Sequence, residues 1–344
     1  MLSNLLLEEY NNINSLLSKS IDKFTNKSVL ITGANGLIGS YIVDFLSYIN
    51  SENQLNIKIY ALSRSMDKLK QRFKNHLNIE FLEQDLNEPL KYNLNFDYII
   101  HAASNSHPMA FSKDPVGTMK TNFIGTLNLL DSLKISNGKF LYISTGEIYG
   151  NNTGKAFVEN DLGIVDTKIS RSCYPESKRA SETLCMAYSQ QYGVCVNVAR
   201  LCYVYGPTIT ETNSRADAQF LRNALNNENI ILKSKGLQRR TYCYVADAVS
   251  ALLYILLNGK NGEVYNVANS DSIVSVSEYA NILANIANVS VSYEIPDEIE
   301  SRGYSKPADS ILDSSKLQSI GWKPFYNIHT GLEHTIKLKK ENLC

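Results

Sequence analysis

Apolar and polar positions follow a regular succession between residues 28 and 207. The segment "SVLIT" (28–32) is apolar, a glycine-rich turn follows it, and the next positions have the spacing of an amphipathic helix. Apolar and helical segments then alternate, which predicts an α/β fold with a parallel sheet covered by helices on both faces. The further expected strands are 57–65, 79–86, 96–104, 139–145 and 194–206, and the further expected helices are 64–76, 118–136 and 176–193.

Both ends of the chain depart from this succession. Residues 1–27 carry apolar side chains near helical spacing, which predicts one or two amphipathic helices. They form either a packed extension, which we favour, or an oligomer contact. From about residue 208 the pattern loosens into loops, short strands and one helix at 246–257. We therefore expect an N-terminal helical extension (1–27), a nucleotide-binding domain (28–207) and a smaller α/β lobe that mainly binds the substrate (208–344).

Composition and charge disfavour several classes of partner. The 344 residues include 34 Lys and Arg against 34 Asp and Glu, so neither nucleic acid nor an anionic membrane is expected as the main partner. Six scattered cysteines without a C-x-x-C pair are typical of a reduced cytosolic protein. No apolar segment has transmembrane length, and Glu8 and Glu9 stand where a signal peptide is apolar, so we expect a cytoplasmic location. The five histidines lack ligand spacing, and we expect no metal site.

The glycine-rich turn "TGANGLIGS" predicts a nucleotide site. Three glycines between a strand and a helix let the backbone approach a pyrophosphate, and the helix N-terminus offers N–H donors. The alternative is a tight turn that uses glycine only for positive φ. We expect the cofactor to contact residues throughout this turn, namely Gly33, Asn35, Gly36, Leu37, Ile38 and Gly39.

Residues after the second strand bear on the choice of cofactor. An acid there would bind the adenosine ribose of NAD, but the segment reads "ALSRS". Arg64 could hold the 2′-phosphate of NADP, or it could be a solvated helix-start arginine. We favour NADP over NAD and leave both open. Asp85 could accept from the adenine amino group, or could be a solvated loop aspartate. The remaining expected contacts of this site are Leu86, Ala102 and Ala103.

The segment "CYPESK" places Tyr174 and Lys178 four residues apart, on one helical face if Pro175 lies in the first turn. A tyrosine acts as a base at neutral pH only if its pKa falls by about three units, which requires roughly 4 kcal/mol. One unit charge near 4 Å supplies about that much at an effective dielectric of 20. We expect Lys178 and a nicotinium ring to supply it together.

Six segments resemble those of extended short-chain dehydrogenases/reductases, the NAD-dependent epimerase/dehydratase family that acts on nucleotide sugars. They are "TGANGLIGS", "HAAS", "STGEIYG", "YPESK", "RLCYVYGP" and "RRTYCYVAD", and the resemblance covers about 28–330. It implies a Rossmann-type doubly wound sheet binding a nicotinamide cofactor, a C-terminal lobe for the NDP-sugar, and a homodimer. It implies further that Tyr174 is the base, Lys178 binds the nicotinamide ribose, Thr145 binds the sugar 4-hydroxyl and Asn122 lies near the cofactor.

Glu147 resembles the glutamate of sugar 4,6-dehydratases ("STDE", "STSE") and of UDP-glucuronate decarboxylases ("STSE"). In dehydratases it removes the C5 proton once C4 is a ketone, which is reasonable because a ketone acidifies its α-hydrogen. The alternative is that Glu147 caps the following turn. Gly146 departs from the "STDE" pattern, whose aspartate protonates the leaving 6-hydroxyl. "YPESKRASE" and "SRADAQFL" also resemble the decarboxylases, which need only the 4-ketone.

The substrate lobe has two candidate anchors. Arg215 and Arg240 match arginines that hold the nucleotide or its diphosphate in this family, and an arginine fork suits such groups. Tyr203 departs from the usual Asn of "RLFNVYGP" near the diphosphate. We expect a 4,6-dehydratase that oxidises C4 through Tyr174 and abstracts the C5 proton through Glu147. Decarboxylation of a nucleotide-linked uronic acid, C4 or C5 epimerisation, and a redox-sensing binding protein are the alternatives.

Overall fold

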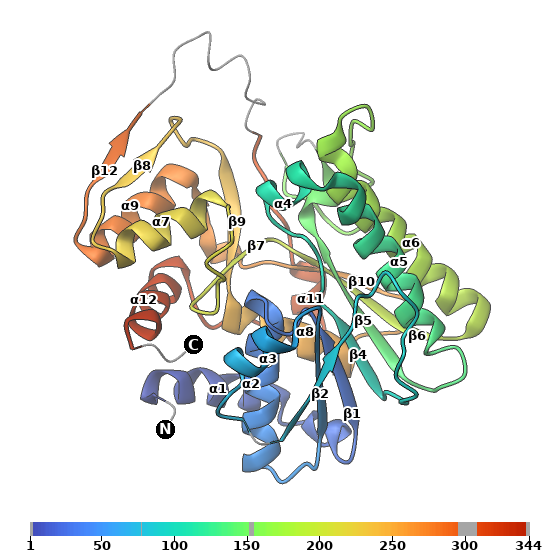
Figure 1. Cartoon of the computed structure of the whole chain (residues 1–344). Coiled ribbons are helices and arrows are strands. Elements are labelled where there is room, and N and C mark those ends of the chain that lie inside the picture. The colour runs from blue at the N-terminus through green and yellow to red at the C-terminus, as the bar shows by residue number, and fades with distance from the viewer. Residues whose placement is uncertain (1–2, 77, 151–154, 295–307, 342–344) are drawn as a thin grey trace.

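A computed structural model describes residues 3–76, 78–150, 155–294 and 308–341 (Figure 1). Seven parallel strands form its central sheet in the order β10-β6-β5-β4-β1-β2-β3. The order reverses direction between β1 and β4, which is the doubly wound arrangement expected for a Rossmann-type fold. The strands are β1 (Ser28–Thr32), β2 (Lys58–Ser63), β3 (Ile79–Glu83), β4 (Tyr98–His101), β5 (Lys139–Thr145), β6 (Cys195–Leu201) and β10 (Val264–Val267).

Helices cover both faces of this sheet. On strand β1, Val29 and Ile31 belong to the apolar cluster that includes α2 and α8, whereas Leu30 belongs to the cluster with α5 and α6. Successive side chains of a strand point to opposite faces, so a strand buried on both sides is apolar throughout. The helices are α2 (Leu37–Glu52), α3 (Met66–Arg72), α4 (Pro108–Lys113), α5 (Pro115–Asp131), α6 (Cys173–Tyr192) and α8 (Val245–Asn258).

The segment 194–206, expected to be one strand, contains two. Strand β6 pairs with β5 and β10 in the large sheet, whereas β7 (Tyr203–Tyr205) pairs with β9 (Arg239–Tyr244) in a separate three-stranded sheet. The change of sheet at Cys202 carries the chain from the Rossmann-type sheet into the smaller lobe. The other elements of the lobe are α7 (Ala216–Leu225), β8 (Ile230–Leu232), β11 (Ile273–Ser275), α9 (Val276–Ala287), β12 (Val291–Tyr293), α11 (Ser315–Ser319) and α12 (Ile328–Lys340).

The chain returns to the large sheet after it has entered the lobe. Helix α8 packs against β5 and β6, and β10 is the edge strand beside β6. The helix expected at 246–257 therefore exists, but it covers the sheet instead of building the lobe. The division at residue 207 stays a prediction, with α8 and β10 as later contributions to the first domain.

Helix α1 (Asn4–Leu17) confirms the amphipathic helix expected near the N-terminus. Its buried side chains include Leu6, Tyr10, Ile13 and Leu17, and it packs against α2, α8 and α12. These contacts account for its apolar face as a packed extension. Within the described part of the chain, no helix is both long enough and apolar enough to span a bilayer.

Candidate functional site

The carboxyl ends of β1 and β4 approach each other at the point where the strand order reverses. Gly33 directly follows β1 with a φ of +64°, and a Cβ atom on it would lie 2.8 Å from the backbone nitrogen of Ala103 after β4. The Thr32 hydroxyl accepts from the Ala103 N–H at 3.2 Å and lies 2.8 Å from His101 Nδ1. Only glycine fits this close approach, which brings the two strand ends together below the N-terminus of α2.

A cavity of about 1560 Å³ opens above these strand ends. Its lining contains most of the residues predicted from the sequence: Gly33, Asn35, Gly36, Leu37, Ile38, Gly39, Arg64, Asp85, Leu86, Ala102, Ala103, Thr145, Tyr174, Lys178 and Arg215. Asn122, Glu147 and Arg240 are absent from the lining. The cavity is therefore continuous from the glycine-rich turn to the tyrosine and lysine of α6, and it fits a dinucleotide in extent and in the identity of its walls.

Tyr174 lies in the first turn of α6, which begins at Cys173, so Pro175 falls where proline is tolerated. Burial raises the pKa of Tyr174 to about 12, and the negative charge of Glu147 also raises it. Arg215, a hydrogen bond with Thr145 and the charge of Arg171 lower it. The protein groups around the phenol therefore favour its protonated form.

Lys178 is buried one helical turn after Tyr174. Its ammonium group donates to the carbonyl of Ile143 at 2.8 Å and lies 4.8 Å from the ring centre of Tyr142. Burial lowers the pKa of Lys178 to about 7. The expectation that Lys178 and a nicotinium ring together lower the pKa of Tyr174 stays a prediction; in this structure the Lys178 ammonium group is directed at a β5 carbonyl.

Glu147 lies in the short 3-10 turn Gly146–Tyr149 that follows β5. Its Oε2 atom forms an ion pair with Arg171 Nη2 at 2.6 Å, and the side chains of Glu147 and Arg171 are 27% and 46% exposed. The Arg171 guanidinium stands 4.3 Å from the ring centre of Phe111, which stacks on Tyr174 at 5.3 Å. Sequence reasoning missed Arg171, whose only signal was its position three residues before Tyr174.

The turn at Gly146 has little room for a side chain. A Cβ atom at this position would lie 2.8 Å from Cδ1 of Leu312 and 3.2 Å from its Cδ2. Leu312 is 3% exposed and belongs to a small apolar cluster with Ile148, Tyr149 and Phe157. An aspartate at position 146 would require the Leu312 side chain to shift within this cluster.

Asn122 does not line the cavity, but it forms hydrogen bonds with residues on two segments next to it. Its side chain accepts from Ser104 Oγ at 2.7 Å and donates to Ser177 Oγ at 2.9 Å. Its backbone carbonyl accepts from Ser181 Oγ at 2.9 Å. Asn122 thus links the segment after β4 to the same helix that carries Tyr174 and Lys178.

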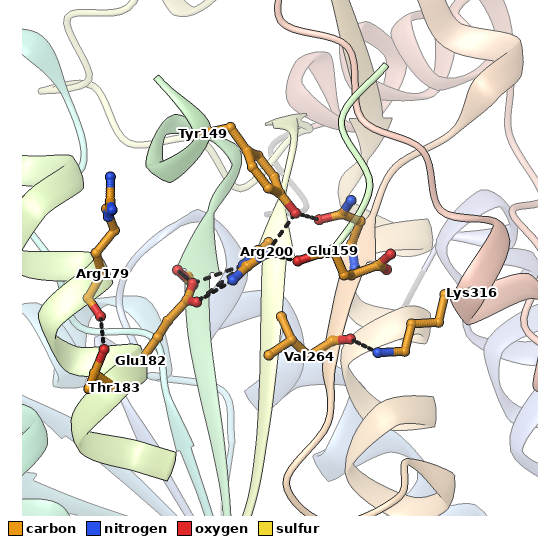
Figure 2. Close-up of polar contacts among 10 residues, drawn as sticks. Tyr149, Glu159, Arg179, Glu182, Thr183, Arg200, Val264 and Lys316 are labelled. Carbon is orange, nitrogen blue, oxygen red and sulfur yellow. Dashed lines mark hydrogen bonds and ion pairs between the residues drawn. The ribbon is translucent and has the colours of Figure 1, made fainter. Parts of the chain in front are cut away.

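A buried ion pair supports the ends of β5 and β6. Arg200 Nη2 and Glu182 Oε2 lie 2.8 Å apart, and Arg200 also donates to the Tyr149 hydroxyl and the Glu159 carbonyl (Figure 2). Glu182 in turn accepts from Ser144, the residue before Thr145. Because this pair is well hydrogen-bonded, it fixes α6 against the strand end that presents Thr145.

Arg215 and Arg240 occupy different surroundings. Arg215 lines the cavity and donates to the Ser106 carbonyl at 2.7 Å, which ties α7 to the segment after β4. Arg240 lies over the ring of Tyr203, 4.4 Å from its centre. Tyr203 therefore takes the place of the expected Asn as a platform for Arg240. In the described ranges, no group of three His, Cys, Asp or Glu residues is arranged to hold a metal ion.

Comparisons with known proteins show the family of this chain. The model of the NAD dependent epimerase/dehydratase family matches residues 29–268. UDP-glucuronic acid decarboxylase 6 of Arabidopsis thaliana is 33% identical over 313 residues, which are 90% of this chain and 87% of that protein. The chain belongs to the NAD-dependent epimerase/dehydratase family. The resemblance inferred from the six sequence segments is confirmed.

Solved structures of this family have the same fold. UDP-glucose 4-epimerase of Thermotoga maritima, solved with UDP-glucose, has a TM-score of 0.77 at 24% identity and covers 92% of this chain and 100% of its own. UDP-glucuronic acid 4-epimerase of Bacillus cereus was solved with UDP-glucuronic acid and NAD. It has a TM-score of 0.76 at 22% identity, and the match covers 92% of this chain and 99% of that protein. This family member is therefore an NAD(P)-dependent enzyme that modifies nucleotide sugars.

Proposed function

We propose that this family member decarboxylates a nucleotide-linked uronic acid after oxidising its C4 hydroxyl. The observation that carries the proposal is the combination of an intact Thr145–Tyr174–Lys178 set with the closed position at Gly146. Thr145, Tyr174 and Lys178 suit oxidation at C4. Gly146 provides no acid at the position where 4,6-dehydration would use one. The decarboxylase relative at 33% identity supports the same choice.

The cofactor supplies a hydride acceptor that also returns the hydride, so it is regenerated in each turnover. The residues of this chain then have separate tasks. Thr145 and Tyr174 hold the 4-hydroxyl, and Tyr174 takes its proton as the C4 hydride leaves. Lys178 binds the nicotinamide ribose. Asn122 and the Glu182–Arg200 pair keep α6 and the end of β5 in register.

Decarboxylation needs no further acid at C6. A ketone at C4 makes the C6 carboxylate a β-keto acid: the C5–C6 bond breaks, carbon dioxide leaves, and the electron pair is delocalised onto the C4 carbonyl. C5 then takes a proton, and C4 is reduced again. In this scheme a water molecule supplies the C5 proton, and Glu147, the carboxylate whose charge acts on Tyr174, relays that proton to C5 instead of removing one.

Dehydration is the second candidate because the charge of Glu147 acts on Tyr174, and a C5 base must lie near that residue. In that reaction Glu147 removes the C5 proton and water leaves from C6. With Gly146 beside Leu312, the leaving hydroxyl would take its proton from water. NADP in preference to NAD, the homodimer and the cytoplasmic location stay predictions.

A mass-based assay tests the proposal. The enzyme with its nicotinamide cofactor is incubated with UDP-glucuronate, UDP-glucose and dTDP-glucose, and the products are followed by mass spectrometry. We expect UDP-glucuronate to lose one carbon dioxide and the two hexoses to keep their mass. Loss of one water from a hexose would establish dehydration, and unchanged masses with new sugar NMR signals would establish epimerisation.

A further inference from the structure

Arg171 lies immediately before the catalytic helix, in the 3-10 turn Ser170–Ser172. Its side chain is 46% exposed, and its Nη2 atom contacts Glu147 Oε2 at 2.6 Å. Neither residue lines the cavity, but each lies within three residues of a lining residue, Thr145 or Tyr174. The position is close to the reacting groups, because Arg171 packs on the Phe111 ring, which in turn stacks on the ring of Tyr174. A positive charge at this place is not needed to oxidise a neutral sugar.

Stacked rings hold the orientation of the Arg171 side chain. Its guanidinium packs on the face of Phe111, 4.3 Å from the ring centre, and Phe111 stacks on the Tyr174 ring with an interplanar angle of 27°. Phe111 is 2% exposed and Tyr174 is 4% exposed, so both rings are fixed by packing. The Arg171 guanidinium therefore packs on the ring that stacks on the Tyr174 phenol, and this packing holds its orientation before a ligand binds.

Most hydrogen-bonding capacity of Arg171 remains available. A guanidinium has five N–H donors, and among the described residues only Glu147 accepts from Arg171. The remaining N–H groups can bind a second carboxylate in the paired geometry that arginine prefers. The other arginines near the site are differently engaged: Arg215 donates to the Ser106 carbonyl, and Arg240 lies over Tyr203.

We propose that Arg171 binds the C6 carboxylate of the substrate and bridges it to Glu147. This inference rests on the proposed uronic acid substrate. It goes beyond that proposal by naming the residue that recognises the C6 carboxylate. One guanidinium between two carboxylates offsets their mutual repulsion, which would otherwise exclude an acidic sugar from the neighbourhood of Glu147. The bridge also places Glu147 near C5, where a proton is required once carbon dioxide has left.

Binding of two substrates that differ only at C6 tests the inference. Affinities of UDP-glucuronate and UDP-glucose are measured by calorimetry on the cofactor-loaded enzyme. Wild type should favour UDP-glucuronate. Arg171→Ala should weaken UDP-glucuronate by about ten- to a hundredfold, the range of one charge-assisted hydrogen-bond pair, and leave UDP-glucose unchanged. Arg171→Lys should retain part of the preference because it keeps the charge without the fork.

A matched control and an opposite-sign variant sharpen the test. Arg179→Ala removes an arginine of the same helix region that pairs with Glu176, and it should leave both affinities unchanged. Glu147→Gln removes the competing negative charge, so it should tighten UDP-glucuronate binding. If Arg171 served only to hold Glu147, Arg171→Ala and Glu147→Gln would change the two affinities in the same direction. Thermal unfolding of each variant checks that it is folded.

The outcomes separate this inference from the proposed reaction. Arg171-dependent binding of UDP-glucuronate without release of carbon dioxide would refute decarboxylation and uphold the carboxylate site. Release of carbon dioxide at wild-type rate and affinity by Arg171→Ala would uphold decarboxylation and overturn the role of Arg171. Equal affinity of wild type for the two sugars would also overturn it.

Discussion

Lys178 lies one helical turn after Tyr174, yet its ammonium group donates to the carbonyl of Ile143 at 2.8 Å. The charges that act on the Tyr174 phenol come from Glu147, Arg215 and Arg171, and burial places its pKa at about 12. The two residues therefore share a helical face, while the ammonium group of Lys178 is engaged with a β5 carbonyl. The groups that act most strongly on the Tyr174 phenol include Glu147, Arg215, Thr145 and Arg171.

Variants of Glu147 and Thr145 should move the pH profile in opposite directions. A tyrosine base is active when deprotonated, so activity rises with pH through its pKa. Glu147 raises the pKa of Tyr174, so Glu147→Gln should move the acid limb of kcat/KM to lower pH. The Thr145 hydrogen bond lowers that pKa, so Thr145→Ala should move the limb to higher pH. Rate profiles between pH 5 and 10, taken with saturating cofactor, measure both shifts.

If the acid limbs of Glu147→Gln and Thr145→Ala moved in the same direction, or if neither moved, the proposed effects of these residues on the pKa of Tyr174 would be contradicted. Thr145→Ser retains the hydroxyl and is the matched control, with a profile close to that of wild type. General-base loss typically costs 10²–10⁴-fold in rate, so Tyr174→Phe should lose turnover by about that factor and should no longer show the acid limb that Tyr174 produces.

Lys178 should matter more for cofactor binding than for the pKa of the phenol. Lys178→Met keeps the length of the stem and removes the charge, so it should weaken cofactor binding by about ten- to a hundredfold, as expected for a lost charge-assisted contact. Titration of the cofactor by fluorescence measures this effect. A variant that binds cofactor normally but shifts the acid limb to higher pH would show that Lys178 acts on Tyr174 in the working enzyme instead.

The sequence predicted best what depends on local pattern. The glycine turn, the strand ends and the spacing of Tyr174 and Lys178 are set by neighbouring residues, and the structure brings them together around one cavity. Residues 118–136 were expected as a helix, which instead begins at Pro115 because Asp114 caps it by accepting from the Gly117 N–H. An aspartate directly before a proline is a local signal for this helix start.

Long-range contacts explain what could not be predicted. The direction of Lys178, the ion pair between Glu147 and Arg171 and the wall that Leu312 forms at Gly146 join segments separated by 24 or more residues. Likewise, the division of 194–206 into two strands depends on the partners β9 and β10, which come later in the chain. Apolar periodicity carries no information about such partners.

Arg64 provides a test of the cofactor preference. It lies directly after β2, lines the cavity and is exposed. If it binds the 2′-phosphate of NADP, Arg64→Ala should weaken NADP by about ten- to a hundredfold and leave NAD nearly unchanged. Isothermal titration calorimetry measures the affinities of wild type and Arg64→Ala for NADP and for NAD. Equal losses for NADP and NAD, or tighter binding of NAD by wild type, would rule out the NADP preference.

An apolar stripe on α5 provides a test of the predicted homodimer. Val116, Met119 and Phe123 recur at helical spacing and are 64%, 45% and 39% exposed. Such a stripe on a helix is typical of a surface that another subunit covers. The double variant Met119→Glu/Phe123→Glu should sediment as a monomer where wild type sediments as a dimer. Leu237→Glu, at an exposed apolar residue of the lobe, is the control and should not change the sedimentation.

Glu9 should contribute strongly to stability although it lies in the N-terminal extension. It is completely buried and accepts hydrogen bonds from the hydroxyls of Tyr41 on α2 and Tyr244 on β9, at 2.6 and 2.7 Å. Its Oε1 atom also lies 2.7 Å from His334 Nδ1 on α12. One carboxylate thus joins α1 to the Rossmann-type domain and to the lobe.

Removing that carboxylate takes away an acceptor shared by three side chains. Leaving a buried hydrogen-bond donor without its acceptor costs about 1–3 kcal/mol, so Glu9→Ala should lower the free energy of unfolding by at least about that amount. Glu8→Ala changes an exposed neighbour on the same helix and should stay within about 0.5 kcal/mol of wild type. Urea unfolding followed by circular dichroism measures both. Because α1 contacts α2 and α12, Glu9→Ala should also speed limited proteolysis between the sheet and the lobe. If Glu9→Ala lowered the free energy of unfolding no more than Glu8→Ala does, the N-terminal extension would not stabilise the contact between the Rossmann-type domain and the lobe.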